Sequence, residues 1–176
     1  MGPVEPGVEQ IGRRGPSFLG ALIAFLACPS VVGMLVPIWI SSGDRFRTGS
    51  HPLGLLCVAL GLGGLLWCVR DFYVVGKGTL APWAPPRRLV VVGLYRYVRN
   101  PMYLAVLILV AGIGIWRGSP MTLAYAALLF IVFDLRVRLF EERWLERTFG
   151  DAWGHYRAEV GRWVPHLRPR RSASTP

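Results

Sequence analysis

Charged residues are scarce in this 176-residue chain and are missing from four long stretches of it. They make up 17% of the sequence, whereas hydrophobic residues make up 53%, a balance too apolar for a soluble domain of average composition. The uncharged stretches are residues 15–43, 53–69, 102–116 and 119–133. A membrane-spanning helix needs about 20 apolar residues, so the first stretch is long enough alone. The other three stretches can cross the membrane only if flanking residues extend their helices, and the third could be tilted or re-entrant.

Cysteine and histidine are also few, with three of each. The cysteines lie inside apolar stretches and form no CxxC pair or disulfide framework, so we interpret them as small core residues. The histidines lack metal-ligand spacing, and no structural metal is expected. No Ser–His–Asp arrangement or phosphate-binding loop occurs. The glycines of residues 61–64 do not follow a strand, as a dinucleotide-binding fingerprint requires.

Acidic residues number 10 against 20 lysines and arginines, giving a formal net charge of +10. A nucleic-acid partner is the first hypothesis for so basic a chain, but the distribution of charge favours another explanation. With four spans and a cytoplasmic N-terminus, 17 basic residues lie inside and only Arg45, Arg47 and Arg117 lie outside. The positive-inside rule predicts this asymmetry when both termini are cytoplasmic. We therefore predict an integral protein of the inner or plasma membrane, surrounded by membrane lipids, with no nucleic-acid partner.

The predicted fold is all-α: a polytopic membrane bundle of about four transmembrane helices with a cytoplasmic C-terminal helical segment. Residues 1–16 and 169–176 are expected to be disordered tails of a single domain over residues 17–168. The first two helices are expected at about residues 17–40 and 53–75. Small residues at Ala59 and Gly63, with Gly61 and Gly64 beside them, predict close helix contact in the second helix. Residues 76–100 form a connection long enough to be functional.

The third helix is expected to open at Pro101, since proline suits a first helical turn. Ser119 is the predicted N-cap of the fourth helix, with Pro120 as its first residue. No helix breaker follows before Gly150, so this helix of about 30 residues would be about 45 Å long and leave the membrane. Asp134 and Arg138 are spaced for an ion pair near its boundary, and a short helix is expected around residues 152–160.

One polar segment, residues 94–103, directly precedes the third helix and holds two arginines and three tyrosines. About 40 residues later come Glu141 and Glu142, the only adjacent carboxylates in the chain. The pattern leaves two interpretations of each group. Arg96 and Arg99 either set the topology or hold a carboxylate or phosphate in the guanidinium fork. The glutamates either form a solvated helix face or bind a cationic or hydroxyl-bearing group at the membrane surface.

These residues belong to a larger set that runs over about residues 70–168. Its order and spacing resemble the isoprenylcysteine carboxyl methyltransferase and phospholipid methyltransferase superfamily. The pieces are Gly76-Lys77-Gly78-Thr79-Leu80-Ala81-Pro82, Pro85-Pro86, Leu89-Val90, residues 93–103, Glu141-Glu142 with Leu145, Phe149-Gly150, Tyr156 and Val164-Pro165. The resemblance implies an integral membrane methyltransferase that uses S-adenosylmethionine, without a metal or a covalent nucleophile.

The resemblance also implies which residues form the site. Arg99 and Glu142 are assigned to catalysis, with Arg99 or Arg96 holding the cofactor carboxylate or orienting the acceptor and a glutamate contacting the cofactor's amino or ribose groups. Arg96 and Tyr95 are assigned to the acceptor. The residues implied in cofactor binding are Arg99, Asn100, Pro101, Tyr103, Glu141, Glu142, Trp163 and Pro165.

Asn100 stands where the prenylcysteine enzymes have histidine, and asparagine cannot titrate near neutral pH. The expected acceptor is therefore a lipid-like or small apolar molecule, with a carboxylate, amine, thiol or phenol, rather than a prenylated protein. An NADPH-dependent sterol-type membrane reductase is a second hypothesis, because such enzymes resemble the superfamily in their C-terminal helices. A non-enzymatic scaffold or transporter subunit is a third, although a transporter would carry polar groups at mid-membrane depth.

Overall fold

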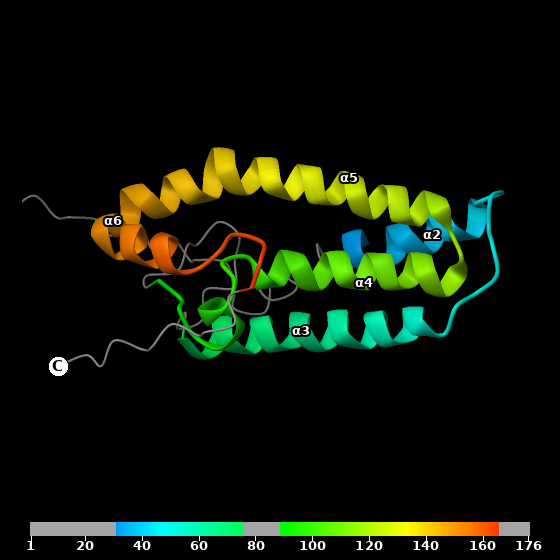
Figure 1. The fold of residues 1–176 in the computed structure, drawn as a ribbon, viewed down its shortest axis with the longest axis horizontal. Helices are drawn as coiled ribbons and strands as arrows, with labels where there is room; N and C mark the ends of the chain where they lie inside the picture. Colours follow the sequence, from blue (N-terminus) through cyan, green and yellow to red (C-terminus); the bar gives the residue numbers. More distant parts are fainter. Residues whose placement is uncertain (1–30, 76–88, 166–176) are drawn as a thin grey trace, which may run out of the picture.

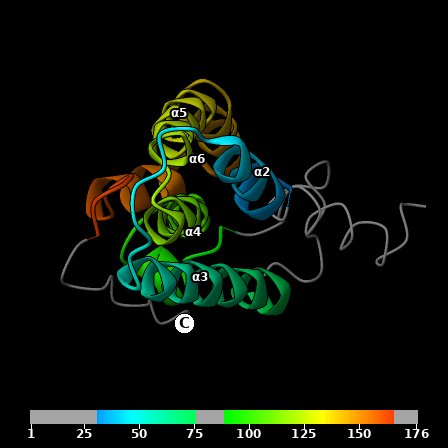
Figure 2. The ribbon, with the colours of Figure 1, turned by 90° about the vertical axis from the view of Figure 1, so that its right-hand side faces the viewer.

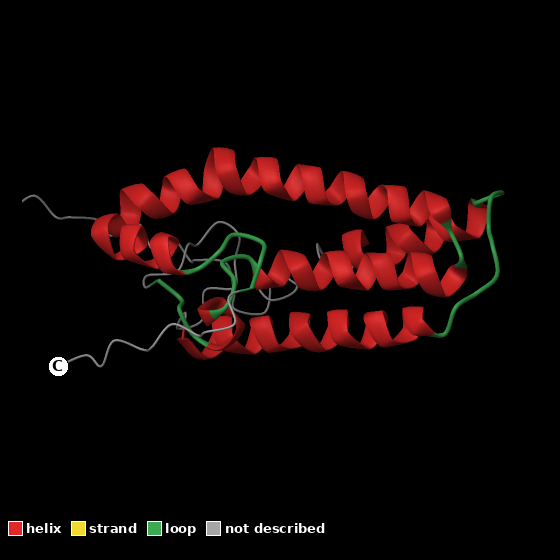
Figure 3. Cartoon of the chain, in the orientation of Figure 1, coloured by secondary structure: helices red, strands yellow, loops and turns green. Residues whose placement is uncertain are grey.

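The computed structural model describes residues 31–75 and 89–165 of the chain. The expected tails, residues 17–30 of the first expected helix and residues 76–88 of the long connection lie outside the described residues. Within the described residues every regular element is helical, and the only strand-like pairing is an isolated bridge between Val98 and Gly161 (Figure 3). The all-α prediction is therefore confirmed for this part of the chain.

The helices form an elongated bundle in which α4 lies between α3 and α5 (Figures 1 and 2). Helix α2 lies beside α4 and α5, and α6 turns back at the end of α5. The elements in chain order are η1 (Val31–Leu35, π-helical), α2 (Val36–Gly43), α3 (Leu53–Val75), η2 (Gly93–Arg96, a 3-10 turn), α4 (Pro101–Arg117), α5 (Pro120–Arg136), η3 (Val137–Glu141, π-helical) and α6 (Glu142–Glu159).

One helix among the described residues is long and apolar enough to cross a membrane, over Leu53–Asp71. Val31–Gly43 and Pro101–Arg117 are shorter apolar helices. This pattern agrees with a membrane-associated protein. The four-span arrangement stays a prediction.

Helices α3 and α4 pack so closely that glycine is needed at their contact. A Cβ atom on Gly61 would lie 2.6 Å from the Leu109 nitrogen, and one on Gly54 would lie 2.2 Å from the Trp116 nitrogen. Small residues permit such backbone contact between helices. The prediction was right for Gly61 and wrong for Gly63, whose Cβ would meet no described atom within 4 Å.

The turn between α4 and α5 fixes the end of the bundle that is distant from α6. Ser119 caps α5 by accepting a hydrogen bond from the Thr122 amide at 3.2 Å, as predicted. The Ser119 hydroxyl also donates to the buried carboxylate of Asp44 at 2.6 Å, and the Met121 amide donates to the same oxygen at 3.0 Å. These hydrogen bonds lower the pKa of Asp44 below its ordinary value, and the bond from the Ser119 hydroxyl has the largest effect. They tie the loop after α2 to the start of α5.

The predicted long fourth helix is present as α5, η3 and α6, which continue from Pro120 until Gly150 (Figure 1). Gly150 has φ 48° and ψ −121°, a conformation that breaks the helix. The last turns, to Glu159, then fold back toward the segment that precedes α4 (Figure 1). The π-helical turn at Val137–Glu141 was not predicted, and it lies directly before Glu142.

Candidate functional site

The two adjacent glutamates bind different partners, and a π-helical turn ends between them. Glu142 is buried, and its carboxylate accepts three charge-assisted hydrogen bonds. Arg99 Nη1 donates to Oε1 at 2.8 Å. Arg162 donates to Oε1 at 2.8 Å and to Oε2 at 2.7 Å. Glu141 instead accepts from the Tyr103 hydroxyl and from Arg136 Nε at 2.9 Å. Turns of this kind often mark functional sites.

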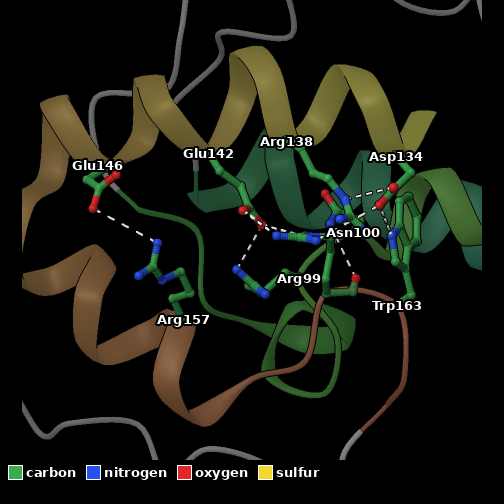
Figure 4. Close-up of polar contacts among 9 residues, drawn as sticks. Arg99, Asn100, Asp134, Arg138, Glu142, Glu146, Arg157 and Trp163 are labelled. Carbon is green, nitrogen blue, oxygen red and sulfur yellow. Dashed lines mark hydrogen bonds and ion pairs between the residues drawn. The ribbon is translucent and has the colours of Figure 1, made fainter. Parts of the chain in front are cut away.

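Arg99 reaches Glu142 from the segment before α4, and the C-terminal residues hold that segment in place. The Arg99 amide donates to the Gly161 carbonyl at 2.9 Å, and Asn100 Nδ2 donates to the Arg162 carbonyl at 3.2 Å. The Arg99 guanidinium also lies 5.6 Å from the centroid of the Trp153 ring, within cation–π range. Figure 4 shows Arg99 and Glu142 facing each other between these elements.

Electrostatics distinguishes the two arginines that bind Glu142. Burial lowers the pKa of Arg99, and the neighbouring Glu142 carboxylate partly offsets that effect. The hydrogen bonds with Glu142 raise the pKa of Arg162. Arg99 Nε is buried and has no hydrogen-bond partner among the described residues. An unpaired buried donor is costly, so this atom is suited to bind an anionic oxygen of a ligand.

An ion-pair and aromatic layer adjoins the Arg99–Glu142 pair on the side of α5. Trp163 Nε1 donates to Asp134 Oδ1 at 2.8 Å, and Asp134 pairs with Arg138 at 2.7 Å, as its helical spacing predicted (Figure 4). The Trp163 ring lies 5.2 Å from that of Phe130 and 6.5 Å from that of Tyr103, centroid to centroid. The C-terminal segment is thereby fixed across α4 and α5.

A family model described as phospholipid methyltransferase matches residues 50–152, which is more than half of the chain. The chain belongs to the phospholipid methyltransferase family. Membership confirms the resemblance inferred from the sequence and indicates membrane methyltransferase activity. No curated protein and no solved structure matches the chain.

The matched region of this phospholipid methyltransferase family member contains Arg99, Glu141 and Glu142 but ends before the C-terminal segment. Arg162, which makes two of the three bonds to Glu142, therefore lies beyond the family match.

The structure brings most of the predicted site residues together. Arg99 contacts Glu142, Tyr103 contacts Glu141, and Asn100 and Trp163 join the cluster through Arg162 and Asp134. Pro101 is buried as the first residue of α4. Their roles in binding a cofactor stay predictions.

The other three predicted residues are Tyr95, Arg96 and Pro165. Tyr95 is buried in an apolar cluster with Cys68 and Val90, on the side of α3, although its carbonyl accepts a 2.7 Å hydrogen bond from Tyr156. Arg96 ends the 3-10 turn η2. Pro165 is exposed at the end of the described segment.

Sequence reasoning did not assign Arg162, Arg136 or Trp153 to the site. Arg162 directly precedes Trp163, which the resemblance did select, so an arginine beside that position was a usable signal. Trp153 lies three residues after the Phe149-Gly150 motif. Its contact with Arg99 depends on the helix break at Gly150, which brings the end of α6 back to the segment before α4.

Proposed function

We propose that the protein is an S-adenosylmethionine-dependent methyltransferase that methylates a lipid-like or small apolar acceptor at the cytoplasmic face of the membrane. The observation that carries the proposal is the buried contact of Arg99 with Glu142, 43 positions apart in sequence, beside the apolar helices. Family membership supports methyl transfer over the NADPH-dependent reductase and the non-enzymatic scaffold.

The proposed membrane arrangement has four spans, with the N- and C-termini in the cytoplasm. Large apolar side chains on the outer surfaces of α3 and α5 support it, because exposed apolar patches of this extent indicate contact with lipid. Examples are Leu60 at 61% exposure, Leu66 at 65% and Leu128 at 57%. The Arg99–Glu142 pair would then lie at the inner boundary, and Arg47 and Arg117 at the outer one.

Cysteine labelling tests this topology. In a cysteine-free background, Ser50→Cys should react with an impermeant maleimide added outside intact cells, and Thr148→Cys should react only after permeabilisation. Both positions are exposed in the structure. Labelling of both from the same side would contradict the arrangement.

The residues present fit a cofactor that carries a carboxylate and a cationic centre. Arg99 Nε has no partner within the described ranges, and an arginine fork suits a carboxylate. Glu142 already accepts from two arginines, so we assign it to orienting them. Glu141, whose side chain is 31% exposed, is the better placed of the two for a ribose hydroxyl or amino group.

S-adenosylmethionine would supply an electrophilic methyl group on a sulfonium. The chain's own contribution is then to align donor and acceptor and to exclude water, since positioning alone can contribute several kcal/mol to a displacement. Tyr103 and Trp163 would cover the polar cluster on the side of the apolar helices. Asn100 would keep the segment before α4 attached to the C-terminal residues.

Product identification is the decisive test. Membranes that contain the protein should transfer a labelled methyl group from S-adenosylmethionine to an extractable apolar product, which mass spectrometry identifies. Membranes with Arg99→Ala at equal expression should lose the product. Labelling that is equal in both would refute the proposed role of Arg99, and binding of NADPH without methyl transfer would refute the proposed function.

A further inference from the structure

A group of arginines lies at the end of the bundle that is distant from α6, apart from the proposed cofactor site. The loop after α2 contributes Arg45 and Arg47, and the last residue of α4 is Arg117. Figures 1 and 2 show this loop crossing the end of the bundle to reach α3. Residues 44–50 and 117–121 contain these three arginines and one acid, Asp44, so this end of the bundle has a net charge of +2.

Hydrogen bonds hold Arg47 against Arg117. Arg47 Nε donates to the Arg117 carbonyl at 3.2 Å, and Arg117 Nη2 donates to the Ser42 hydroxyl at 3.1 Å. The neighbouring backbone fixes the contact, because the Thr48 amide donates to the Gly118 carbonyl at 2.8 Å. Gly118 has φ 58°, and a Cβ atom on it would lie 2.4 Å from the Thr48 carbonyl oxygen. Glycine therefore permits an approach that places both arginines in one small region.

A structural role accounts for only part of these two side chains. The Arg117 carbonyl lies at the C-terminal end of α4, where positive charge is favoured, and this explains the bond from Arg47 Nε. No further hydrogen bond joins the Arg47 side chain to a described residue. Arg117 Nε is buried and has no hydrogen-bond partner in the described ranges. Since an unpaired buried donor is destabilising, the position of Arg117 is not explained by stability alone.

Asp44 is already committed to other donors. Its Oδ1 accepts a hydrogen bond from the Phe46 amide at 2.8 Å, and its Oδ2 accepts from Ser119 and from the Met121 amide. The carboxylate thus lies at the N-terminal end of α5, whose partial positive charge it offsets. No ion pair joins Arg47 or Arg117 to an acid of the described residues.

The arginines near the proposed cofactor site are different. Each of them forms an ion pair with Glu141, Glu142 or Asp134; they are Arg99, Arg136, Arg138 and Arg162. The described part of the chain therefore supplies carboxylates to arginines at one end of the bundle and none to Arg47 and Arg117 at the other. Positive charge that is held in place without a counter-ion is suited to bind an anion from outside the chain.

Exposed aromatic side chains indicate the depth at which this anion would lie. Trp39 on α2 and Trp116 on α4 are both exposed, and Trp116 directly precedes Arg117. Tryptophan is enriched where a membrane meets water. In the proposed membrane arrangement Arg47 and Arg117 then lie at the level of the lipid headgroups, where the abundant anion is a phosphate. The planar fork of arginine matches a phosphate with two hydrogen bonds.

We propose that Arg47 and Arg117 bind the phosphate of an anionic phospholipid in the outer leaflet, one whose headgroup has no positive charge. A zwitterionic headgroup would bring an ammonium to an end of the bundle that is already positive and where Asp44 is occupied. Because Arg117 Nε is covered in the structure, its guanidinium must turn when the phosphate binds. The site is separate from the proposed cofactor site and does not depend on methyl transfer. The proposed membrane arrangement determines only the leaflet.

A fluorophore near the two arginines tests this site on the full-length protein in detergent micelles. It is attached to Ser50→Cys in a cysteine-free background, since Ser50 is exposed in the same loop and reports binding at this end alone. Phosphatidylglycerol and phosphatidylcholine with the same spin-labelled acyl chain are titrated separately, and quenching gives an apparent Kd. We expect the Kd for phosphatidylglycerol to be at least about tenfold lower, the effect of one charge-assisted hydrogen bond.

Two variants separate local binding from the overall charge of the protein. Arg47→Gln should raise the Kd for phosphatidylglycerol at least about tenfold, because it removes a charge-assisted hydrogen bond. Arg147→Gln is the matched control: it removes the same charge from an exposed position on α6. This control should leave the Kd within a factor of about three, since salt screens distant charges.

Three results would overturn the inference. They are equal Kd values for the two lipids, an unchanged Kd in Arg47→Gln, and displacement of phosphatidylglycerol by an equal concentration of inorganic phosphate, which would assign the site to a free ion. If Arg47→Gln does not fold, Arg47→Lys replaces it. Lysine keeps the charge but lacks the planar fork, so binding should still be weaker, and an unchanged Kd would contradict the phosphate contact. None of these results bears on the proposed methyl transfer.

Discussion

Glu142→Gln is the most informative single substitution, because it removes one charge from a cluster of three. In the native protein Glu142 is the counter-ion of both Arg99 and Arg162, whose side chains are 10% and 25% exposed. Glutamine keeps the shape of the side chain but leaves two partly buried arginines close together without a neutralising charge. Breaking a buried ion pair costs about 3–5 kcal/mol. We expect about 3 kcal/mol here, since the glutamine oxygen still accepts a hydrogen bond.

Two measurements follow from that figure. Thermal unfolding in detergent should show an apparent Tm lower by about 6–12 °C, using the usual scaling for proteins of this size. Calorimetry should show S-adenosylmethionine binding weakened at least about tenfold, because the arginines lose the group that orients them. Glu146→Gln is the control: Glu146 lies on the same helix, is 62% exposed and meets Arg157 only at 3.9 Å. It should change stability by less than about 1 kcal/mol. Affinity that is unchanged or tighter in Glu142→Gln would refute the orienting role.

The remaining predictions concern the elements that support the site. Gly61→Val should prevent stable packing of α3 on α4, because its Cβ would lie 2.6 Å from the α4 backbone; Gly63→Ala should be tolerated, and equal yields of folded protein would contradict the contact. Deleting Leu139 from the π-helical turn should rotate Glu142 by about 100° and abolish S-adenosylmethionine binding without preventing membrane insertion; binding that survives would show that the turn is dispensable. Folding lowers the pKa of Asp44 below its ordinary value of 3.8. The Asp44 carboxylate should therefore stabilise the fold at pH values above 3.8, and this stabilisation should be lost as the pH falls below 3.8. Asp44→Asn should remove this acid-dependent part of the unfolding curve.

Local signals in the sequence predicted where helices begin and end. Pro101 opens α4, Ser119 caps α5 and Gly150 breaks α6, each through its own backbone chemistry. The approach of Arg99 to the glutamates was predicted only through the family resemblance. Spacing alone left open whether Glu141 and Glu142 form a solvated helix face.

The parts that could not be predicted depend on local irregularities of the helix backbone. The π-helical turn has no sequence signal of its own, yet it sets the direction of Glu142 relative to α5, and Glu142 contacts Arg99 while Glu141 contacts Tyr103. Arg162 was missed for a similar reason. Its bond to Glu142 forms only after the chain reverses at Gly150, and no local pattern encodes that reversal's direction.

The buried acidic residues in the described part of the chain differ in how many hydrogen bonds each carboxylate accepts. Asp44 accepts from a hydroxyl and two amides, and Glu142 accepts from two arginines, so both are fully used within the fold. Asp71 is equally buried but has one oxygen without a donor in the same part of the chain. In a protein with half as many acids as bases, Asp71 therefore has only a 3.6 Å ion pair with the exposed Arg70, and no described residue donates to its second oxygen.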